Sequence, residues 1–290
     1  MSDLSAAAVL ADNAYGKSRV RLTKVVRDGD RHHVLEMSVD IRLHGDFAAS
    51  YTDGDNTRVV ATDSMKNTVY VLARENQFAS IDAFAALLVR HFVDTYGQVT
   101  AAEAAIEQTM FDRIAVDGRP HAHAFTGGRG DRRTCRFRLD RGGAMQRSGG
   151  VTDLVVLKSG GSQFVDFVDD RYRTLPDTTE RIFATSIDAT WRYPDPSVDP
   201  EGTITYDEVR AAFLACFATR HSLAVQQTLL EMGEAALAAA PAIDRVELTL
   251  PNQHRVPFNL EPFGLDNPAT IFVPTDEPFG LISGAVERAT

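Results

Sequence analysis

The sequence contains little cysteine. Cys135 and Cys216 are the only two among 290 residues, the first in a strand-like run and the second in a helix-like one. Two such residues exclude a disulfide-rich secreted scaffold and a cysteine-based metal knuckle. A reducing compartment fits this usage, and we expect a cytoplasmic protein.

Long apolar runs and an excess of positive charge are also missing. No run approaches the roughly 20 apolar residues that cross a bilayer, and the start of the sequence lacks a basic segment followed by an apolar core. The formal net charge is −10. This charge disfavours a broad nucleic-acid groove but leaves room for a local basic pocket that binds a small anion. We expect neither a membrane nor a nucleic acid as partner.

The common cofactor and metal motifs are absent. The sequence has no GxxxxGK[ST], GxGxxG, HExxH, CxxC or GxSxG pattern. The glycine-rich segment 127–133, GGRGDRR, lacks the lysine and serine of a phosphate loop, and we interpret it as a hairpin loop with a chance Arg-Gly-Asp. His121 and His123 would lie on one face of a strand, as two metal ligands do, but the sequence places no third ligand beside them. Hydrogen bonding is the favoured role for this pair, and we expect no metal.

Alternating apolar residues and turn signals indicate strands and helices. An Asp-Gly turn joins strand-like residues 18–27 to the alternating residues 35–43. Two helices follow, one starting at Thr62 and one near Ser80, which we expect to be an N-cap. Further strands are predicted at 100–114, 121–125, 132–139, 153–158, 187–192 and 245–250, further helices at 206–219 and 223–239, and more extended chain at 258–260 and 270–273.

The order of strand pair, helix pair and strand pair occurs twice. It predicts an α+β protein with antiparallel sheets and helices layered on one face of each sheet. The glycine-rich stretch 142–150 suggests a boundary, with a first domain at 10–145 and a second at 146–290. We find no residue-level repeat between them. A sheet with one uncovered face needs another cover, and closure into an oligomeric barrel would supply it and remove exposed edges.

Six short segments, spread over nearly the whole chain, carry the strongest functional signal. They are YGKSRVRL, VVATDSMKNTVYVLAR, LKSGGSQFVDF, RTLPDTTERIFATSIDATW, AVQQTLLEM and LPNQHRVPF. Together and in this order they resemble the motifs of the urate oxidase (uricase) family. The resemblance implies two tandem domains of the tunnelling fold (T-fold), assembled as a homotetramer.

The resemblance also implies an active site shared between two chains. Lys17 and Thr62 come from one chain, and His254 from its neighbour completes the catalytic set. The other residues implied are Arg181 and Gln226, which grip the purine edge; Phe164, on which the purine stacks; Asn252, which holds oxygen or water; Val225 and Ile282, which line the pocket; and Asp63, which offers a backbone N–H.

The implied reaction oxidises urate with molecular oxygen to 5-hydroxyisourate and hydrogen peroxide, without a metal or a flavin. The substrate must then be the reductant, so a proton has to be removed, and Lys17 beside Thr62 is the implied base. The residue types suit a planar anion, because Arg181 supplies a fork of donors and Phe164 a stacking surface. Thr62 opens a helix whose N-terminus favours an anion, so we expect it to serve both as cap and as binding residue.

Taken singly, these residues have ordinary interpretations. Lys17 would be a solvated lysine, Phe164 a core residue, and Arg181 an ion-pair partner of Glu180 or Asp177. Only the joint match favours the functional assignment.

Two other functions stay open. A zinc-dependent pterin-type enzyme of the same fold would use His121 and His123 as ligands. A non-catalytic purine-binding module would bind urate without consuming oxygen.

Overall fold

Long antiparallel strands dominate the computed structural model, which describes residues 8–275 and 277–289. The chain forms two compact units. Unit 1 contains the residues up to Gln108 together with Thr134–Arg147, and unit 2 contains Thr109–Arg133 together with the residues from Ser148 onward. The limits 10–145 and 146–290 stay a prediction about the domains of the sequence.

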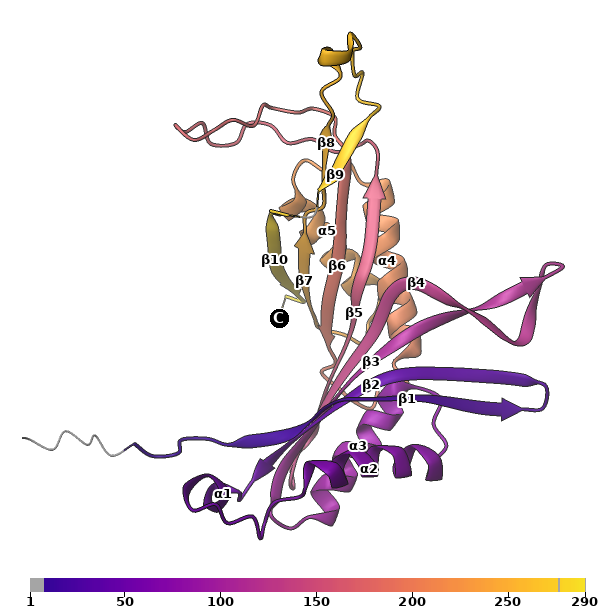
Figure 1. Ribbon diagram of the computed structural model, residues 1–290, viewed down its shortest axis with the longest axis vertical. Helices are drawn as coiled ribbons and strands as arrows, with labels where there is room; N and C mark the ends of the chain where they lie inside the picture. Colours follow the sequence, from indigo (N-terminus) through magenta and orange to yellow (C-terminus); the bar gives the residue numbers. More distant parts are fainter. Residues whose placement is uncertain (1–7, 276, 290) are drawn as a thin grey trace, which may run out of the picture. The chain divides into compact units, whose positions relative to one another are not determined.

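Unit 1 is built on a strand pair, a five-residue helix, two longer helices and a second strand pair, in the strand order β1-β2-β3-β4. Gly29, with a φ of 54°, opens the short turn between the first two strands. Helices α2 and α3 cover one face of these strands (Figure 1). Its elements are β1 (Ala14–Asp28), β2 (Arg31–Gly45), α1 (Ala48–Thr52), α2 (Thr62–Glu75), α3 (Ile81–Thr95), the first part of β3 (Val99–Val116) and the last part of β4 (Arg119–Asp140). The remaining parts of β3 and β4, within residues 109–133, belong to unit 2.

The core of unit 1 follows the predicted alternation. In β2 the apolar side chains of Leu35, Met37, Val39, Ile41 and Leu43 are buried, whereas the residues between them are not. The helices add the buried side chains Met65, Val69, Phe84, Leu88 and Phe92 to the same cluster. Apolar residues recur every two positions on the strand and every 3.6 positions on the helices, and both sets pack into one core.

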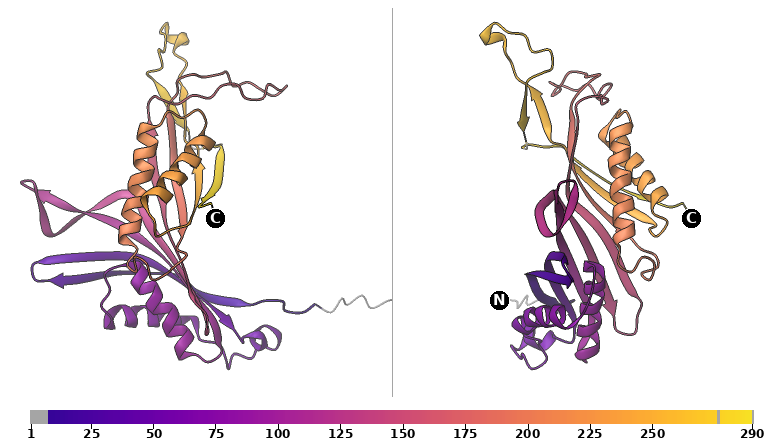
Figure 2. Two further views of the ribbon diagram at one scale, coloured as in Figure 1. Left: turned by 180° about the vertical axis from the view of Figure 1, so that it is seen from behind. Right: turned by 90° about the vertical axis from the view of Figure 1, so that its right-hand side faces the viewer.

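Unit 2 repeats this plan with the strand order β5-β6-β7-β10 and a separate two-stranded sheet of β8 and β9. Helices α4 and α5 lie on one face of the four strands (Figure 2). Its elements are β5 (Met145–Lys158), β6 (Phe183–Arg192), α4 (Thr203–Thr219), α5 (Val225–Ala239), β7 (Arg245–Pro251), β8 (His254–Pro257), the 3-10 turn Glu261–Phe263, β9 (Phe272–Thr275) and β10 (Leu281–Glu287). The predicted α+β class with tandem strand-pair and helix-pair units is confirmed.

The first strand pair of each unit carries the same bulge. In unit 1 the register shifts between Lys17 and Val20, so that two residues oppose Asp40 alone. In unit 2 it shifts between Val151 and Leu154, so that two residues oppose Asp188 alone. In both bulges the second of the two residues that oppose the aspartate has a positive φ, 58° at position 19 and 59° at position 153, and its backbone N–H donates to that aspartate.

This repeat can be read in the sequence once the bulges align it. GKSRV at 16–20 matches GVTDL at 150–154, and SVD at 38–40 matches SID at 186–188. Gly16 is required by close approach, because a Cβ there would lie 1.9 Å from the carbonyl oxygen of Ile41. These matches share only one glycine, one serine and one aspartate, so the repeat lies in the backbone geometry, and the expectation that the halves share no residue-level repeat stays a prediction.

Three local predictions were wrong. Residues 127–133 lie inside the long strand β4 and not in a hairpin loop. Residues 258–260 form no strand, because the extended pairing ends at Pro257. Thr62 is the first helical residue of α2, and Ala61 occupies the N-cap position. The Ser80 cap is confirmed, since its hydroxyl accepts from the N–H of Ala83 at 3.2 Å. Within the described residues, no helix combines the length and apolar character of a membrane span.

Candidate active site

Lys17 lies on the helix-covered face of unit 1. It pairs with Ile41 across β1 and β2, and Ile41 is buried in the core beneath the helices. Directly opposed residues of an antiparallel pair project on the same side. The lysine side chain therefore points toward the helices, and it is only partly exposed.

The start of α2 provides the second component. No side chain caps its first turn, and among the described residues the Thr62 hydroxyl has no hydrogen-bond partner. The pKa of Asp63 is lowered mainly by its hydrogen bond to Lys66 and by the charge of that lysine, with a smaller contribution from the charge of Lys17. Lys17 and this helix terminus thus lie within electrostatic reach of each other. The first-turn N–H groups have no acceptor within the helix, so the Thr62 hydroxyl and these donors are free to bind a ligand.

Arg181 is held by the connection between β5 and β6, residues 159–182, which leaves the sheet of unit 2 as a long excursion (Figure 1). Its backbone N–H donates to the Ser162 carbonyl at 2.9 Å, and its Nε donates to the Ser162 hydroxyl at 3.3 Å. Its Nη2 atom is buried and has no partner in the described part of the chain. Burial lowers the pKa of the Arg181 guanidinium.

The simpler reading of Arg181 as an ion-pair residue is wrong. Asp177 pairs with Arg173 at 2.9 Å, and the Glu180 carboxylate accepts from the N–H of Gly161 at 2.6 Å. Both neighbouring carboxylates are therefore engaged elsewhere. A buried guanidinium donor without an acceptor is costly, and a bound anion would remove that cost.

Phe164 forms a flat surface beside this guanidinium. Two backbone hydrogen bonds with Thr178, at 2.7 and 2.9 Å, fix its position. Its ring stacks on Phe167 with centroids 4.5 Å apart, and the Arg181 Cζ lies 5.3 Å from the ring centroid. The Phe164 side chain is partly exposed, so it is not a core residue.

The N-terminus of α5 is tied to the same connection. Ser162 and Ser222 form an isolated bridge, with Gln163 N–H donating to the Ser222 carbonyl and Ser222 N–H donating to the Gly161 carbonyl, both at 2.9 Å. Val225, the first residue of α5, is buried in the unit 2 core. Gln226 follows it, is exposed, and has no hydrogen-bond partner among the described residues. Its amide can thus contribute a donor and an acceptor to a ligand.

Asn252, His254 and Ile282 lie where β7 and β10 meet the start of β6. Asn252 bridges to Thr185, and its N–H donates to the Gly280 carbonyl at 2.8 Å. His254 opens β8 and pairs with Thr275. Ile282 pairs with Leu250 in β10 and packs against the unit 2 core. Arg181 lies two residues before β6. Asn252, His254 and Ile282 therefore lie at the same end of the sheet as Arg181.

The structure thus places the predicted residues in two sets. Unit 1 holds Lys17, Thr62 and Asp63, and unit 2 holds Phe164, Arg181, Val225, Gln226, Asn252, His254 and Ile282. Sequence reasoning did not find Ser162, which positions Arg181, or Thr185, whose hydroxyl donates to the Pro251 carbonyl at 2.8 Å. Both lie inside the recognised segments, and no feature of the sequence distinguished them from their neighbours.

The histidine pair exists on β4. The rings of His121 and His123 lie 4.6 Å apart, edge to face, and His123 N–H donates to His121 Nδ1 at 3.2 Å. Across residues 8–275 and 277–289, no group of three or more potential metal ligands comes together. The pair therefore has no third protein ligand in the described chain.

Comparison with known families identifies the chain. The family model described as Uricase matches residues 13–138 and 147–283. The chain belongs to the uricase family. Among curated relatives, the uricase of Arthrobacter globiformis is 43% identical over 97% of this chain and 90% of its own length. The uricase of Dictyostelium discoideum is 34% identical over 97% and 98%.

Solved structures agree with this assignment. The crystal structure of uricase from Arthrobacter globiformis matches with a TM-score of 0.90 at 42% identity, covering 97% of this chain and 95% of that one. A hyperthermostable mutant of Bacillus sp. TB-90 urate oxidase matches with a TM-score of 0.83 at 21% identity, covering 95% and 99%. The second comparison bears on the fold alone. Both support the tandem T-fold that the motifs implied.

Proposed function

We propose that this chain catalyses the oxidation of urate by molecular oxygen to 5-hydroxyisourate and hydrogen peroxide, a step of purine degradation, using neither a metal nor an organic cofactor. Its family makes it an oxidoreductase of the urate oxidase type. The observation that carries the proposal is the buried Arg181 guanidinium, with a free Nη2 atom beside the Phe164 ring.

Urate has the shape and charge that this arrangement requires. It is planar and anionic near neutral pH, so it can accept from the guanidinium fork along one edge while its face lies on Phe164. A charge-assisted hydrogen bond contributes about 1.5–3 kcal/mol. Gln226 would add a donor and an acceptor along the same edge. Val225 and Ile282 would give the pocket apolar walls.

The chemistry then falls to Lys17, Thr62 and His254. Lys17 takes a proton from bound urate, and the resulting dianion gives up electrons to dioxygen. Oxygen adds to the ring as a hydroperoxide, hydrogen peroxide leaves, and water supplies the hydroxyl group of the product. Asn252 would hold oxygen or water above the ring, while Thr62 and His254 relay the protons of that water. One urate, one dioxygen and one water thus give one 5-hydroxyisourate and one hydrogen peroxide.

A homotetramer with shared sites would join the two sets of residues. Lys17, Thr62 and Asp63 of one chain would face the unit 2 residues of its neighbour. The helix-free face of β5 supports such an assembly, because Val155 and Leu157 there are 60% and 52% exposed. Apolar side chains left uncovered on a sheet mark an interaction surface. We place this assembly in the cytoplasm.

The test is to monitor urate by its ultraviolet absorbance, together with an oxygen electrode, after exhaustive chelation of the purified protein. We expect urate loss and oxygen consumption in equal amounts. Activity that disappears with chelation and returns with zinc would instead support the pterin-type enzyme. Urate binding without oxygen consumption would support the non-catalytic module, and either result would contradict the proposal.

A further inference from the structure

The bulge in β1 decides on which face of the sheet Lys17 lies. In a regular strand, residues three apart project to opposite faces, so Lys17 and Val20 would be on opposite sides. Here both pair with core-facing residues of β2, Lys17 with Ile41 and Val20 with Val39. Val20 is 4% exposed and belongs to the core. The one extra residue therefore brings Lys17 to the helix side, because a shift of one residue reverses the facing of a strand.

Asp40 stabilises the conformation that the bulge needs. Arg19 has a φ of 58°, a region that is unfavourable for a residue with a side chain. Its backbone N–H donates to Asp40 Oδ1 at 2.5 Å. Asp40 is the residue that the two bulged residues oppose, so its carboxylate satisfies the N–H group that the irregular pairing leaves without a ladder partner.

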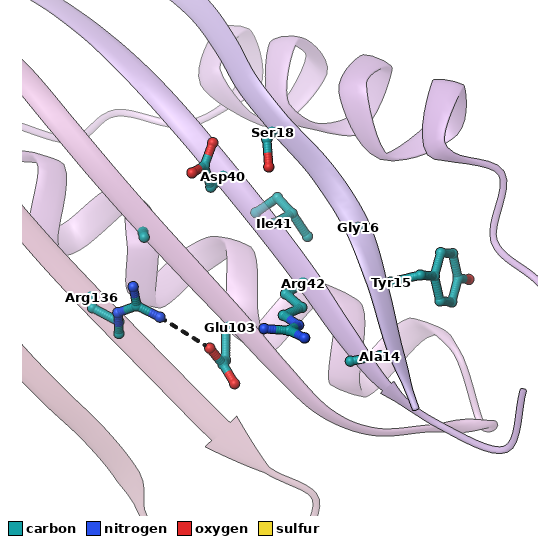
Figure 3. A pocket seen from close by; sticks show the side chains of 10 residues that line it. Ala14, Tyr15, Gly16, Ser18, Asp40, Ile41, Arg42, Glu103 and Arg136 are labelled. Carbon is teal, nitrogen blue, oxygen red and sulfur yellow. Dashed lines mark hydrogen bonds and ion pairs between the residues drawn. The ribbon is translucent and has the colours of Figure 1, made fainter. Parts of the chain in front are cut away.

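The carboxylate reaches this N–H from the helix-free side. In Figure 3, Asp40 and Ser18 stand on neighbouring strands in front of the sheet, with the helices behind it. The cavity there has a volume of about 380 Å³, and its lining includes Arg42, Glu103 and Arg136. None of these lies on the face of the proposed site. An effect of Asp40 on the reaction would thus pass through the backbone and not through contact with the substrate.

We propose that Asp40 is a positioning residue for the reaction: by bonding the N–H of Arg19 it holds the bulge that directs Lys17 toward Thr62. This inference rests on the proposed function, in which Lys17 is the base. The chain contains its own control, because Asp188 bonds the N–H of Asp153 at 2.9 Å in the equivalent bulge of unit 2, where the residue matching Lys17 is Val151.

The experiment compares Asp40→Ala, Asp40→Asn and Asp188→Ala by their kcat and KM for urate and by thermal unfolding. Small misplacements of a catalytic group cost up to about a hundredfold, so we expect Asp40→Ala to lower kcat about 10- to 100-fold while KM stays within about threefold. Asp40→Asn should stay within about threefold of the wild-type kcat, because the amide oxygen accepts the same hydrogen bond. Asp188→Ala should lower thermal stability as Asp40→Ala does, yet keep kcat within about threefold.

A second substitution tests the backbone argument directly. Glycine adopts a φ of 58° without a steric penalty, so Arg19→Gly added to Asp40→Ala should restore at least tenfold of a hundredfold loss in kcat. A wild-type kcat in Asp40→Ala, an equal loss in Asp188→Ala, or a loss in Asp40→Asn as large as in Asp40→Ala would overturn the inference.

A crystal structure of Asp40→Ala separates this inference from the proposed function, since it needs no turnover. We expect the bulge to be lost or moved and Lys17 to leave the helix side. An unchanged bulge with Lys17 still directed toward Thr62 would overturn the inference even if the wild-type enzyme oxidises urate. A wild-type protein that leaves urate unchanged would contradict the proposed function alone.

Discussion

The two units share a bulged strand pair covered by two helices, and the difference between the bulges shows how the repeated fold was specialised. Lys17 in unit 1 corresponds to Val151 in unit 2. Val151 is fully buried and packs in the core, whereas Lys17 is partly exposed beside the start of α2. The same backbone device thus directs a core residue in one unit and the proposed base in the other.

The connections after these strand pairs differ as well. In unit 1 the short turn at Gly29 and Asp30 joins β1 to β2. In unit 2 residues 159–182 intervene between β5 and β6, and they carry Phe164 and Arg181. Lengthening a surface loop costs little free energy, so a substrate grip can be added there without disturbing the sheet. Unit 2 carries the proposed substrate-binding residues Phe164 and Arg181 because its connection is long enough to fold back on itself.

Helix N-termini show a third contrast. The first turn of α3 is capped by Ser80, and in α4 the N–H of Thr205 donates to the Asp199 carboxylate at 2.8 Å. The N-cap residues of α2 and α5 are Ala61 and Ala224, and neither provides a side-chain cap. Both helices carry candidate residues, and the five-residue helix α1 also begins without a side-chain cap. Their free N–H groups and positive dipole ends suit an anionic substrate.

Among the predictions that compare the two units, replacing the proposed base Lys17 should have the largest effect. Lys17→Met keeps the length of the side chain but removes the proton acceptor, and loss of a general base costs about 10²- to 10⁴-fold. We therefore expect kcat to fall by that factor while a non-reacting urate analogue still binds. Steady-state oxygen consumption and analogue titration measure the two quantities.

The matched control for Lys17 is Val151→Ala in unit 2. It removes buried methyl groups from a core and should lower the free energy of unfolding by about 1–3 kcal/mol, with kcat within about threefold of wild type. Chemical denaturation and the oxygen assay separate the two effects. Wild-type turnover in Lys17→Met would exclude the lysine as the base.

Replacing Arg181, the proposed substrate-binding arginine, should have a smaller effect than replacing Lys17, and it should change KM instead of kcat. Arg181→Ala removes charge-assisted hydrogen bonds of about 1.5–3 kcal/mol, so we expect KM for urate to rise about 10- to 100-fold. Arg181→Lys should recover little of this affinity, because an ammonium group lacks the planar fork. Initial rates over a wide range of urate concentrations give the comparison.

Arg192→Ala serves as the control for Arg181. This arginine is exposed and makes two 2.8 Å hydrogen bonds to Asp244, so its loss should leave KM unchanged. An unaltered KM in Arg181→Ala would rule out the gripping role. Equal effects of the two substitutions would instead point to a general effect of removing one positive charge from the protein.

Much of the fold was predictable because periodicity reports burial directly. The alternation in β2 and the apolar face of α3 gave those elements close to their observed bounds. The bulges were not predictable in the same way. A positive φ at Arg19 coincides with a hydrogen bond to the opposing strand, and no local preference of arginine signals it. β10 was missed because its alternate residues are exposed and its apolar signal is weak.

The candidate site was found by family resemblance and not by residue chemistry. Arg181 beside Glu180 reads locally as an ion pair, and only the observed bond from Gly161 N–H to Glu180 removes that reading. Thr62 reads locally as a cap, yet it lies one residue inside the helix. For Arg181, the deciding interaction joins Gly161 to Glu180, which are distant in the sequence. For Thr62, the assignment depends on where the helix begins to within one residue. A single sequence specifies neither.

Adding a cap to α5 and removing the cap of α3 should give the smallest kinetic effect. These substitutions test whether the uncapped N-terminus of α5 faces the substrate. Ala224→Asp and Ala224→Asn should each stabilise α5 by about 0.5–2 kcal/mol, because both side chains can accept from first-turn N–H groups. Only the aspartate adds a charge that repels urate, by about 1 kcal/mol at 4 Å in water. We thus expect KM to be about fivefold higher in Ala224→Asp than in Ala224→Asn.

Ser80→Ala in α3 should cost about 1 kcal/mol of stability and leave KM unchanged. Equal KM values in the aspartate and asparagine variants would show that the α5 terminus does not face the anion, and the contrast between capped and uncapped helices would lose its functional meaning.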